Sequence, residues 1–304
     1  MASFLDVQLL DYFSSSLLSP HTLRAYKRTL RTFESWMLFE GFSIDQIDDS
    51  KARQFFHFYF SQKSPSTQVQ ALSALKSLFK SLSLRNPFES VLHARFDPLD
   101  AQISFAQPHQ IASLLSFLGS RQEHYFDRLY HTLTLTLFFT ASRFDEIVSL
   151  DWSSCARDQQ GNIVSLSIRG KGERFSHLPV ELPLSQALNS WKSYQDIIKG
   201  IRLRKVNGLP FASSSKIFAG LSGSKVSNPA FNSALKRASA AVGISPPLTA
   251  HGLRHSAATA LLNAGNDIRV VQEALRHKSI RNTQRYTHVS NAQVKAAFQS
   301  IQLS

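Results

Sequence analysis

The sequence predicts a mainly helical protein of two domains that carries one small β-hairpin. Its 304 residues are enough for two domains of ordinary size, and 43% of them are hydrophobic, so sizeable cores can be buried. Stretches in which apolar residues recur at the helical spacing of three and four appear along the chain. One stretch, residues 162–180, instead alternates apolar and polar residues around Gly170-Lys171-Gly172, a pattern typical of a hairpin.

The first 90 residues are expected to form a helical domain. A helix is predicted to begin at Ser19-Pro20, because proline is favoured in the first turn. Its apolar residues, from Leu23 to Met37, share one face. A further helix begins near Ser64-Pro65. Between the two, residues 45–60 predict another helix, which ends in an aromatic cluster expected to pack in the core.

Basic residues lie on the polar faces of these N-terminal helices. Such a face can follow a phosphate backbone while the opposite face packs. Considered alone, however, a solvated basic face is the simpler interpretation of the first helix. The candidate nucleic-acid contacts in this domain are Arg24, Lys27, Arg28, Arg31, Lys76 and Lys80.

A linker is predicted at residues 91–106, which lack a clear period and contain Pro98. Gln107-Pro108-His109 then opens a second domain, expected to cover residues 107–304 and to end in a docking helix that begins at Ser290. Within it, the run LTLTLFF alternates leucine and threonine, and by period alone this fits a strand. The hairpin that follows presents Lys171 at its tip.

The net charge of +13 favours a polyanionic partner. Residues 1–100 contain 11 lysines and arginines against 10 acids, whereas residues 101–304 contain 23 against 11. Attraction to phosphate groups is therefore expected to be strongest in the second domain. A generic solubilising charge is the alternative, and this asymmetry weakens it.

The composition also bears on location. A single cysteine, Cys155, excludes an internal disulfide framework and suits a reducing cytoplasm. No apolar run approaches the roughly 20 residues that span a bilayer. The stretch MASFLDVQLLDYF lacks the basic leader of a secretion signal. We therefore expect a cytoplasmic protein with no membrane partner.

Four polar residues in the second domain indicate chemistry at a phosphodiester: His251, Arg254, His277 and Tyr286. A phenol is a poor general base at pH 7, because its unperturbed pKa is about 10. It can attack phosphorus if cations neutralise the phosphate and a neighbouring group accepts the phenol proton. Arginine and histidine meet these two needs. The histidines could instead bind zinc, but no third ligand stands at a suitable spacing, so no metal site is predicted.

The stretch HGLRHSAATALLNAGNDIRVVQEALRHKSIRNTQRYTH, residues 251–288, resembles the C-terminal motif of the tyrosine recombinases. This group is also called the phage integrase family and includes the Xer-type resolvases. The stretch Thr140-Ala-Ser-Arg143-Phe-Asp-Glu146 resembles an upstream motif of the same family. The resemblance implies a helical core-binding (SAM-like) domain followed by a catalytic domain with a small β-hairpin or sheet. It also implies that LTLTLFF is a buried helix.

The resemblance further implies how the phosphodiester is cut. Tyr286 attacks phosphorus to form a 3′-phosphotyrosyl link, and His251 accepts its proton. Arg143 and Arg254 bind the non-bridging oxygens, for which the planar guanidinium is well shaped. Lys171 protonates the leaving 5′-oxygen. Neither ATP nor any other cofactor is implied.

Other residues are expected to support these steps. The resemblance implies that His277 donates a hydrogen bond to the phosphate and that Glu146 holds the site together. Alternatively, Arg143 and Glu146 form an ordinary surface ion pair. Contacts with DNA outside the chemistry are predicted for Arg169, Arg174, Arg276 and Arg285.

Three residues depart from the usual family pattern. Ala141 and Ser142 stand where glycine and leucine are usual, and Arg276 replaces the glycine before the histidine. If position 276 requires a positive φ, a residue other than glycine costs on the order of 1 kcal/mol there. Otherwise Arg276 adds a cation beside the phosphate.

The sequence thus predicts a site-specific DNA recombinase that acts on double-stranded recombination sites. It is expected to work as a homotetramer on two sites, or as a hetero-tetramer with a paralogue. One alternative is an enzyme similar to the type IB topoisomerases, which rejoin a strand to itself. The other is a DNA-binding protein with an impaired active site, acting as an architectural factor or a silent partner subunit.

Overall fold

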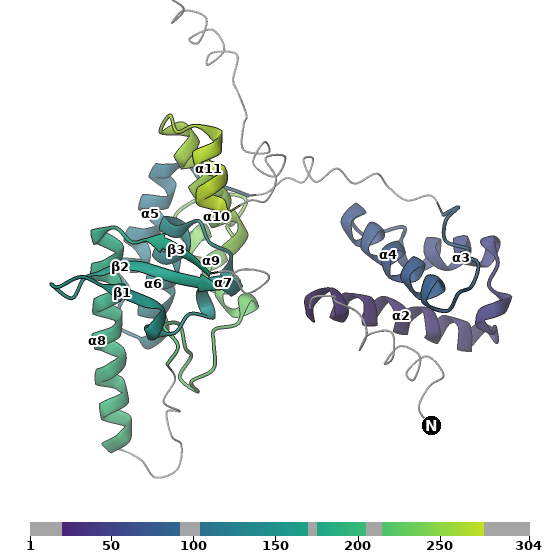
Figure 1. Ribbon diagram of the computed structural model, residues 1–304, viewed down its shortest axis with the longest axis horizontal. Helices are drawn as coiled ribbons and strands as arrows, with labels where there is room; N and C mark the ends of the chain where they lie inside the picture. The colour runs from purple at the N-terminus through teal and green to yellow at the C-terminus, as the bar shows by residue number, and fades with distance from the viewer. Residues whose placement is uncertain (1–19, 92–103, 170–174, 205–214, 277–304) are drawn as a thin grey trace, which may run out of the picture. The chain divides into compact units, whose positions relative to one another are not determined.

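A computed structural model describes residues 20–91, 104–169, 175–204 and 215–276, and for residues 20, 21, 169 and 200–204 only the backbone. The chain divides into two compact units, Met1–Ala101 and Gln102–Ser304 (Figure 1). Within the described ranges, no helix combines the length and apolar character needed to cross a bilayer.

The N-terminal unit consists of α2 (Pro20–Glu40), the 3-10 turn η1 (Ile44–Gln46), α3 (Asp49–Phe60) and α4 (Pro65–Ser81). Local capping explains where two of these helices begin. The Asp48 side chain accepts a hydrogen bond from the Lys51 amide at 2.8 Å, and Ser64 accepts one from Thr67 at 3.4 Å. Proline in the first turn of α4 confirms the start predicted from the sequence.

Aromatic rings fill the core of this unit. The Phe33 ring lies at its centre, 5.0 Å from the Phe55 ring and 5.6 Å from the Phe88 ring between centroids. Both contacts are edge-on, which is a favourable arrangement for aromatic pairs. The predicted packing role of the 54–60 cluster is confirmed for Phe55, Phe56 and Phe60, whereas Phe58 is 77% exposed.

The C-terminal unit is also mainly helical and contains one small sheet. Its helices are α5 (Pro108–Gly119), α6 (Tyr125–Thr140), α7 (Phe144–Val148), α8 (Leu182–Arg204), α9 (Asn228–Ala241), α10 (Ala250–Asn263) and α11 (Ile268–Leu275), with the 3-10 turn η2 (Trp152–Ser154). Strands β1 (Cys155–Arg157), β2 (Ile163–Arg169) and β3 (Phe175–Pro179) form an antiparallel sheet in the order β1-β2-β3. The predicted hairpin is thus confirmed as β2–β3. Its tip, with Lys171, lies outside the described residues.

Helix α6 lies at the centre of this unit, where it packs against α5, α8 and α10 (Figure 1). Leu129, Leu133 and Leu137 on α6 are fully buried. The period of LTLTLFF suggested a strand, and that interpretation is wrong; the buried helix implied by the family resemblance is confirmed. Each threonine can be buried because its hydroxyl donates to the carbonyl four residues earlier, a pattern seen at Thr132, Thr134, Thr136 and Thr140.

Candidate active site

The structure describes the side chains of five predicted site residues in this unit: Arg143, Glu146, His251, Arg254 and Arg276. Of Arg169 it describes the backbone alone, at the end of β2. The remaining candidates lie outside the described residues, namely Lys171, Arg174, His277, Arg285 and Tyr286. The predicted docking helix at residues 290–304 also lies outside them.

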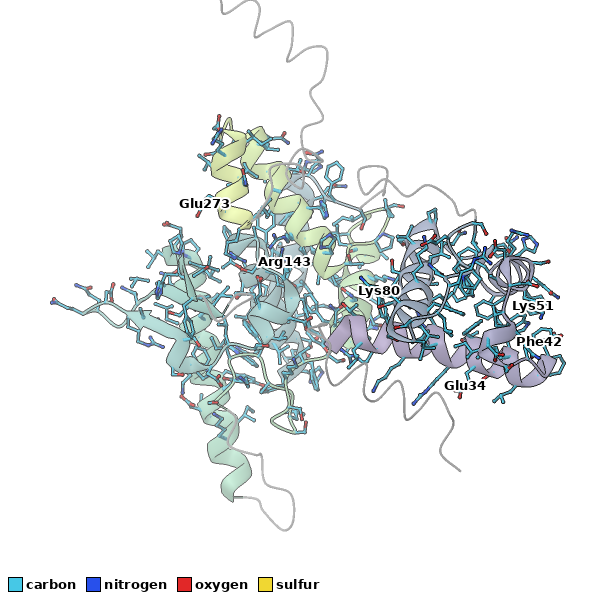
Figure 2. All side chains as sticks on the ribbon, turned by 45° about the vertical axis from the view of Figure 1, so that its right-hand side comes forward. Glu34, Phe42, Lys51, Lys80, Arg143 and Glu273 are labelled. Carbon is cyan, nitrogen blue, oxygen red and sulfur yellow. The ribbon has the colours of Figure 1, made fainter. Side chains whose placement is uncertain are left out.

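Arg143, labelled in Figure 2, follows directly after the turn that ends α6. Ala141 ends the helix in the left-handed region, with φ 47° and ψ 30°, and turns the chain toward α7. Arg143 occupies the N-cap position of α7. Glu146, three residues later, reaches back to accept hydrogen bonds from the Arg143 amide and from Nη1, both at 3.0 Å. The Arg143 side chain remains 54% exposed, so it is accessible to a ligand.

Arg254 lies on α10 and is almost completely buried, with 2% of its surface exposed. Its Nη1 donates to the carbonyl oxygen of Ala141 at 2.7 Å, and its Nη2 donates to that of Leu275 at 2.6 Å. A buried guanidinium requires partners of this kind, because an unpaired buried charge is very costly. Arg254 therefore joins the ends of α6 and α11.

Close packing explains the glycine between His251 and Arg254. A Cβ atom added to Gly252 would lie 2.6 Å from the carbonyl oxygen of Ser104, closer than real Cβ atoms come. The neighbouring chain is held there by the Ala106 amide, which donates to Ser256 Oγ at 2.8 Å. Sequence reasoning missed Gly252, since nothing in the motif shows which segment packs against it.

Sequence reasoning also missed a partner of His251. The Nε2 atoms of His251 and His255 lie 2.9 Å apart, and their rings meet edge-on. One imidazole must donate and the other accept, because two lone pairs cannot form a hydrogen bond. His255 is 4% exposed, while His251 is exposed at the surface. The i, i+4 spacing on a helix was the signal that could have identified this pair.

The three departures from the family pattern, Ala141, Ser142 and Arg276, meet at one place. Arg276 ends α11 in the left-handed region, with φ 53° and ψ 42°, so its position does have a positive φ. Its Nη2 donates to Glu146 Oε2 at 2.7 Å and to Ser142 Oγ at 3.2 Å. Ala141 precedes Ser142 and accepts the bond from Arg254.

Glu146 is the acidic centre of this cluster. Burial tends to raise its pKa, but the hydrogen bond from the Arg143 amide and the charge of Arg276 outweigh burial and lower the pKa below its ordinary value. The carboxylate is therefore ionised at neutral pH. In the described part of the chain, no group of three His, Cys, Asp or Glu side chains is placed to hold a metal ion.

The predicted basic face of α2 forms part of two grooves in the N-terminal unit. The first is lined by Arg24, Lys27, Arg28, Arg31, Thr32 and Ser35. The second runs from α2 to the ends of α3 and α4, and Arg28 lines it together with Tyr59 and Lys63. Sequence reasoning did not select Lys63. Lys76 and Lys80 are both exposed on α4. Figure 2 labels Lys80.

Two family models match the chain. "Phage integrase family" matches residues 104–293, and "Phage integrase, N-terminal SAM-like domain" matches residues 8–86. Tyrosine recombinase XerC of Herpetosiphon aurantiacus is 31% identical over 285 residues, which cover 90% of this chain and 86% of that protein. Tyrosine recombinase XerC of Bifidobacterium longum is 32% identical over 159 residues. These cover 52% of this chain and 43% of that relative, so the match spans less than half of the relative's length.

The fold is similar to that of a solved recombinase. The XerH site-specific recombinase, crystallised with palindromic difH substrate as a post-cleavage complex, aligns with a TM-score of 0.72 and 19% sequence identity. The alignment covers 91% of this chain and 79% of that one. This likeness confirms the predicted fold class of a helical SAM-like domain followed by a recombinase-type catalytic domain.

Proposed function

Because the chain belongs to the phage integrase family, we propose that it is a site-specific DNA recombinase that cuts and rejoins strands through a 3′-phosphotyrosyl intermediate. One observation supports this proposal most directly. Arg254, which is more than 100 residues away in the sequence, meets the Arg143–Glu146 pair at the end of α6, where it donates to the Ala141 carbonyl. This convergence favours an anion site over the surface ion pair that Arg143 and Glu146 could form alone.

The cleavage step follows from the charges of these groups. The Tyr286 oxygen attacks phosphorus as its proton passes to His251, and the bond from phosphorus to the 5′-oxygen breaks. Arg143 and Arg254 stabilise the charge that develops on the non-bridging oxygens, His277 donates a hydrogen bond to the same phosphate, and Lys171 gives a proton to the leaving 5′-oxygen. Attack by a 5′-hydroxyl on the phosphotyrosyl bond reverses these steps. The phosphodiester energy is retained in the enzyme link, so the cycle requires neither ATP nor another energy source.

The N-terminal unit, residues 1–90, would clamp the DNA, followed by the linker 91–106 and the catalytic domain 107–304. The two grooves beside α2 suit a phosphate backbone, because arginine and lysine side chains gather there. Further backbone contacts are assigned to Lys76, Lys80, Arg169, Arg174 and Arg285. A homotetramer on two recombination sites, or a mixed tetramer with a paralogue, would perform strand exchange in the cytoplasm.

A nicked DNA site tests the chemistry. Cleavage next to the nick releases a short fragment that cannot return, so the covalent complex accumulates and migrates as a protein–DNA adduct on a denaturing gel. The wild-type protein should form this adduct, and Tyr286→Phe should not. If the wild type binds the site but forms no adduct, the protein is a DNA-binding factor with an impaired active site.

Strand exchange separates recombination from topoisomerase activity. Two sites with different end labels are incubated together with the protein. A recombinase yields products that carry both labels, whereas an enzyme that rejoins a strand to itself leaves each label on its own duplex. In a parallel reaction, the latter enzyme relaxes a supercoiled plasmid.

A further inference from the structure

Arg276 is held by its side chain at a place where its backbone is unfavourable. The left-handed region that it occupies suits glycine better than arginine. Its guanidinium nevertheless reaches Glu146 at 2.7 Å and Ser142 at 3.2 Å. The Arg276 and Glu146 side chains are each only 16% exposed, so water screens this ion pair weakly. Residues with an unfavourable backbone conformation are concentrated at functional sites, so the position of Arg276 beside the predicted active site suggests a functional role for it.

Glu146 links Arg276 to Arg143, because its carboxylate accepts hydrogen bonds from both arginines. A carboxylate can accept about four hydrogen bonds, and Glu146 accepts two from Arg143 and one from Arg276. Arg143 is the N-cap of the short helix that contains Glu146, whereas Arg276 comes from the end of α11. Among the described contacts of Glu146, Arg276 is therefore the one that fixes the carboxylate relative to another helix.

The Arg276–Glu146 contact also lies next to Arg254 and, along the sequence, to His277. Arg254 donates to the carbonyl of Leu275, the residue before Arg276. His277 is the next residue in the sequence. The Arg276–Glu146 pair thus connects the two segments that carry Arg143 and His277.

We propose that Arg276 is a positioning residue of the cleavage site, which orients the Arg143 guanidinium by holding Glu146 and which does not bind the DNA phosphate itself. This inference rests on the proposed function. It gives Arg276 a different role from the DNA contact predicted from the sequence, because the guanidinium is directed at Glu146.

Two substitutions separate positioning from stability. Arg276→Gln removes the ion pair but keeps a side chain at the left-handed position, and Arg276→Gly removes both the pair and the unfavourable backbone. We expect the glycine variant to melt at a higher temperature than the glutamine variant. Both should cleave a nicked site about 10- to 100-fold more slowly than wild type in single-turnover reactions, since small displacements of a catalytic group have effects of this size.

Arg269→Gln is the matched control, because Arg269 is an exposed arginine on the same helix. It removes the same charge and should leave the cleavage rate unchanged. The double variant Glu146→Gln/Arg276→Gln should cleave no more slowly than Glu146→Gln alone, because Arg276 acts through Glu146.

DNA binding distinguishes the opposing explanations. Under our proposal, the affinity of the Arg276 variants and its dependence on salt match those of wild type. A decrease of about one in the slope of log affinity against log salt, with unchanged cleavage of the bound complex, would identify a phosphate contact and overturn the inference. Cleavage losses that follow melting temperature would also overturn it, in favour of a purely structural role.

The wild-type reaction keeps this test separate from that of the proposed function. If wild type forms no adduct, the proposed function is wrong and the inference falls with it. If wild type forms the adduct and both Arg276 variants cleave at the wild-type rate, only the inference is wrong.

Discussion

The guanidinium of Arg254 and the carbonyl oxygen of Ala141 lie 2.7 Å apart, although 113 residues separate them in the sequence. The same side chain reaches Leu275 at 2.6 Å. One buried arginine therefore joins three parts of the chain that contain predicted catalytic residues. Arg143, by contrast, is half exposed and takes part in a local contact with Glu146. The two arginines assigned to the phosphate thus have different structural roles.

Substituting these two arginines should affect stability differently. Arg254→Gln should lower the free energy of unfolding by about 1–3 kcal/mol, because buried carbonyl groups lose their partners. Arg143→Gln should cost under about 1 kcal/mol, as is usual for an exposed ion pair. Urea denaturation followed by circular dichroism measures both, and each variant should also lose cleavage of the nicked site. Equal stability losses would contradict this assignment of roles.

Gly252→Ala should destabilise the C-terminal unit. The new Cβ would lie 2.6 Å from the Ser104 carbonyl oxygen, so α10 or residues 104–106 must move. Overpacking of this kind costs about 1–3 kcal/mol. Gly220→Ala is the matched control, because its new Cβ would lie at an ordinary 3.6 Å from the Ser224 carbonyl oxygen. Similar melting temperatures for the two variants would show that the contact at Gly252 is not restrictive.

Ala141→Gly should stabilise the protein. Ala141 has a φ of 47°, a conformation that costs a residue with a side chain about 1 kcal/mol relative to glycine. The opposite result is expected for Ala112→Gly, an exposed position within α5, where glycine loses about 1 kcal/mol of helix propensity. Thermal unfolding should therefore shift upward for the first variant and downward for the second.

Arg28→Ala should weaken DNA binding through electrostatics. Arg28 lines both grooves beside α2, so its removal should lower affinity for specific and unrelated DNA alike and reduce the salt slope by about one. Arg85→Ala is a suitable control, since the Arg85 guanidinium pairs with Asp49 at 2.9 Å. Its salt slope should match that of wild type. Salt titrations by fluorescence anisotropy compare the two variants. The same slope for Arg28→Ala as for wild type would remove Arg28 from the proposed DNA contacts.

Cys155 should react slowly with thiol reagents in the folded protein. Burial raises the pKa of its thiol to about 11, an effect that the charge of Arg157 opposes only in part. The thiolate is the reactive form, so little of it exists at pH 8. Reaction with a disulfide reagent at pH 8 should be much faster after unfolding in urea. Equal rates before and after unfolding would show that Cys155 is accessible and ionised like a free thiol.

Much of the fold could be predicted from the sequence, because local signals specify it. Prolines and capping residues marked the starts of α2 and α4, and alternation around Lys171 identified the β2–β3 hairpin. The local period was misleading in α6, where the threonine hydroxyls bond within their own helix and so allow a strand-like sequence to be buried as a helix. Only the family resemblance gave the correct structure there.

The site was predicted in its composition but not in its contacts. Motif spacing selected Arg143 and Arg254, yet it gave no means to tell that one is exposed and the other buried. For Arg276 the sequence left open whether the position needs a positive φ or supplies a cation; the structure gives it a positive φ and an ion pair with Glu146. Such contacts join residues more than 100 positions apart and depend on how the helices pack.

The carbonyl groups that hold Arg254 have a consequence for how strongly the site attracts an anion. Both stand at the C-terminal ends of helices, where aligned peptide dipoles concentrate partial negative charge. These dipoles hold the guanidinium in place but add only partial negative charge. A carboxylate in the same position would add a whole negative charge. Under the proposed function, the site can therefore hold Arg254 rigidly in place and still use its positive charge to attract the phosphate.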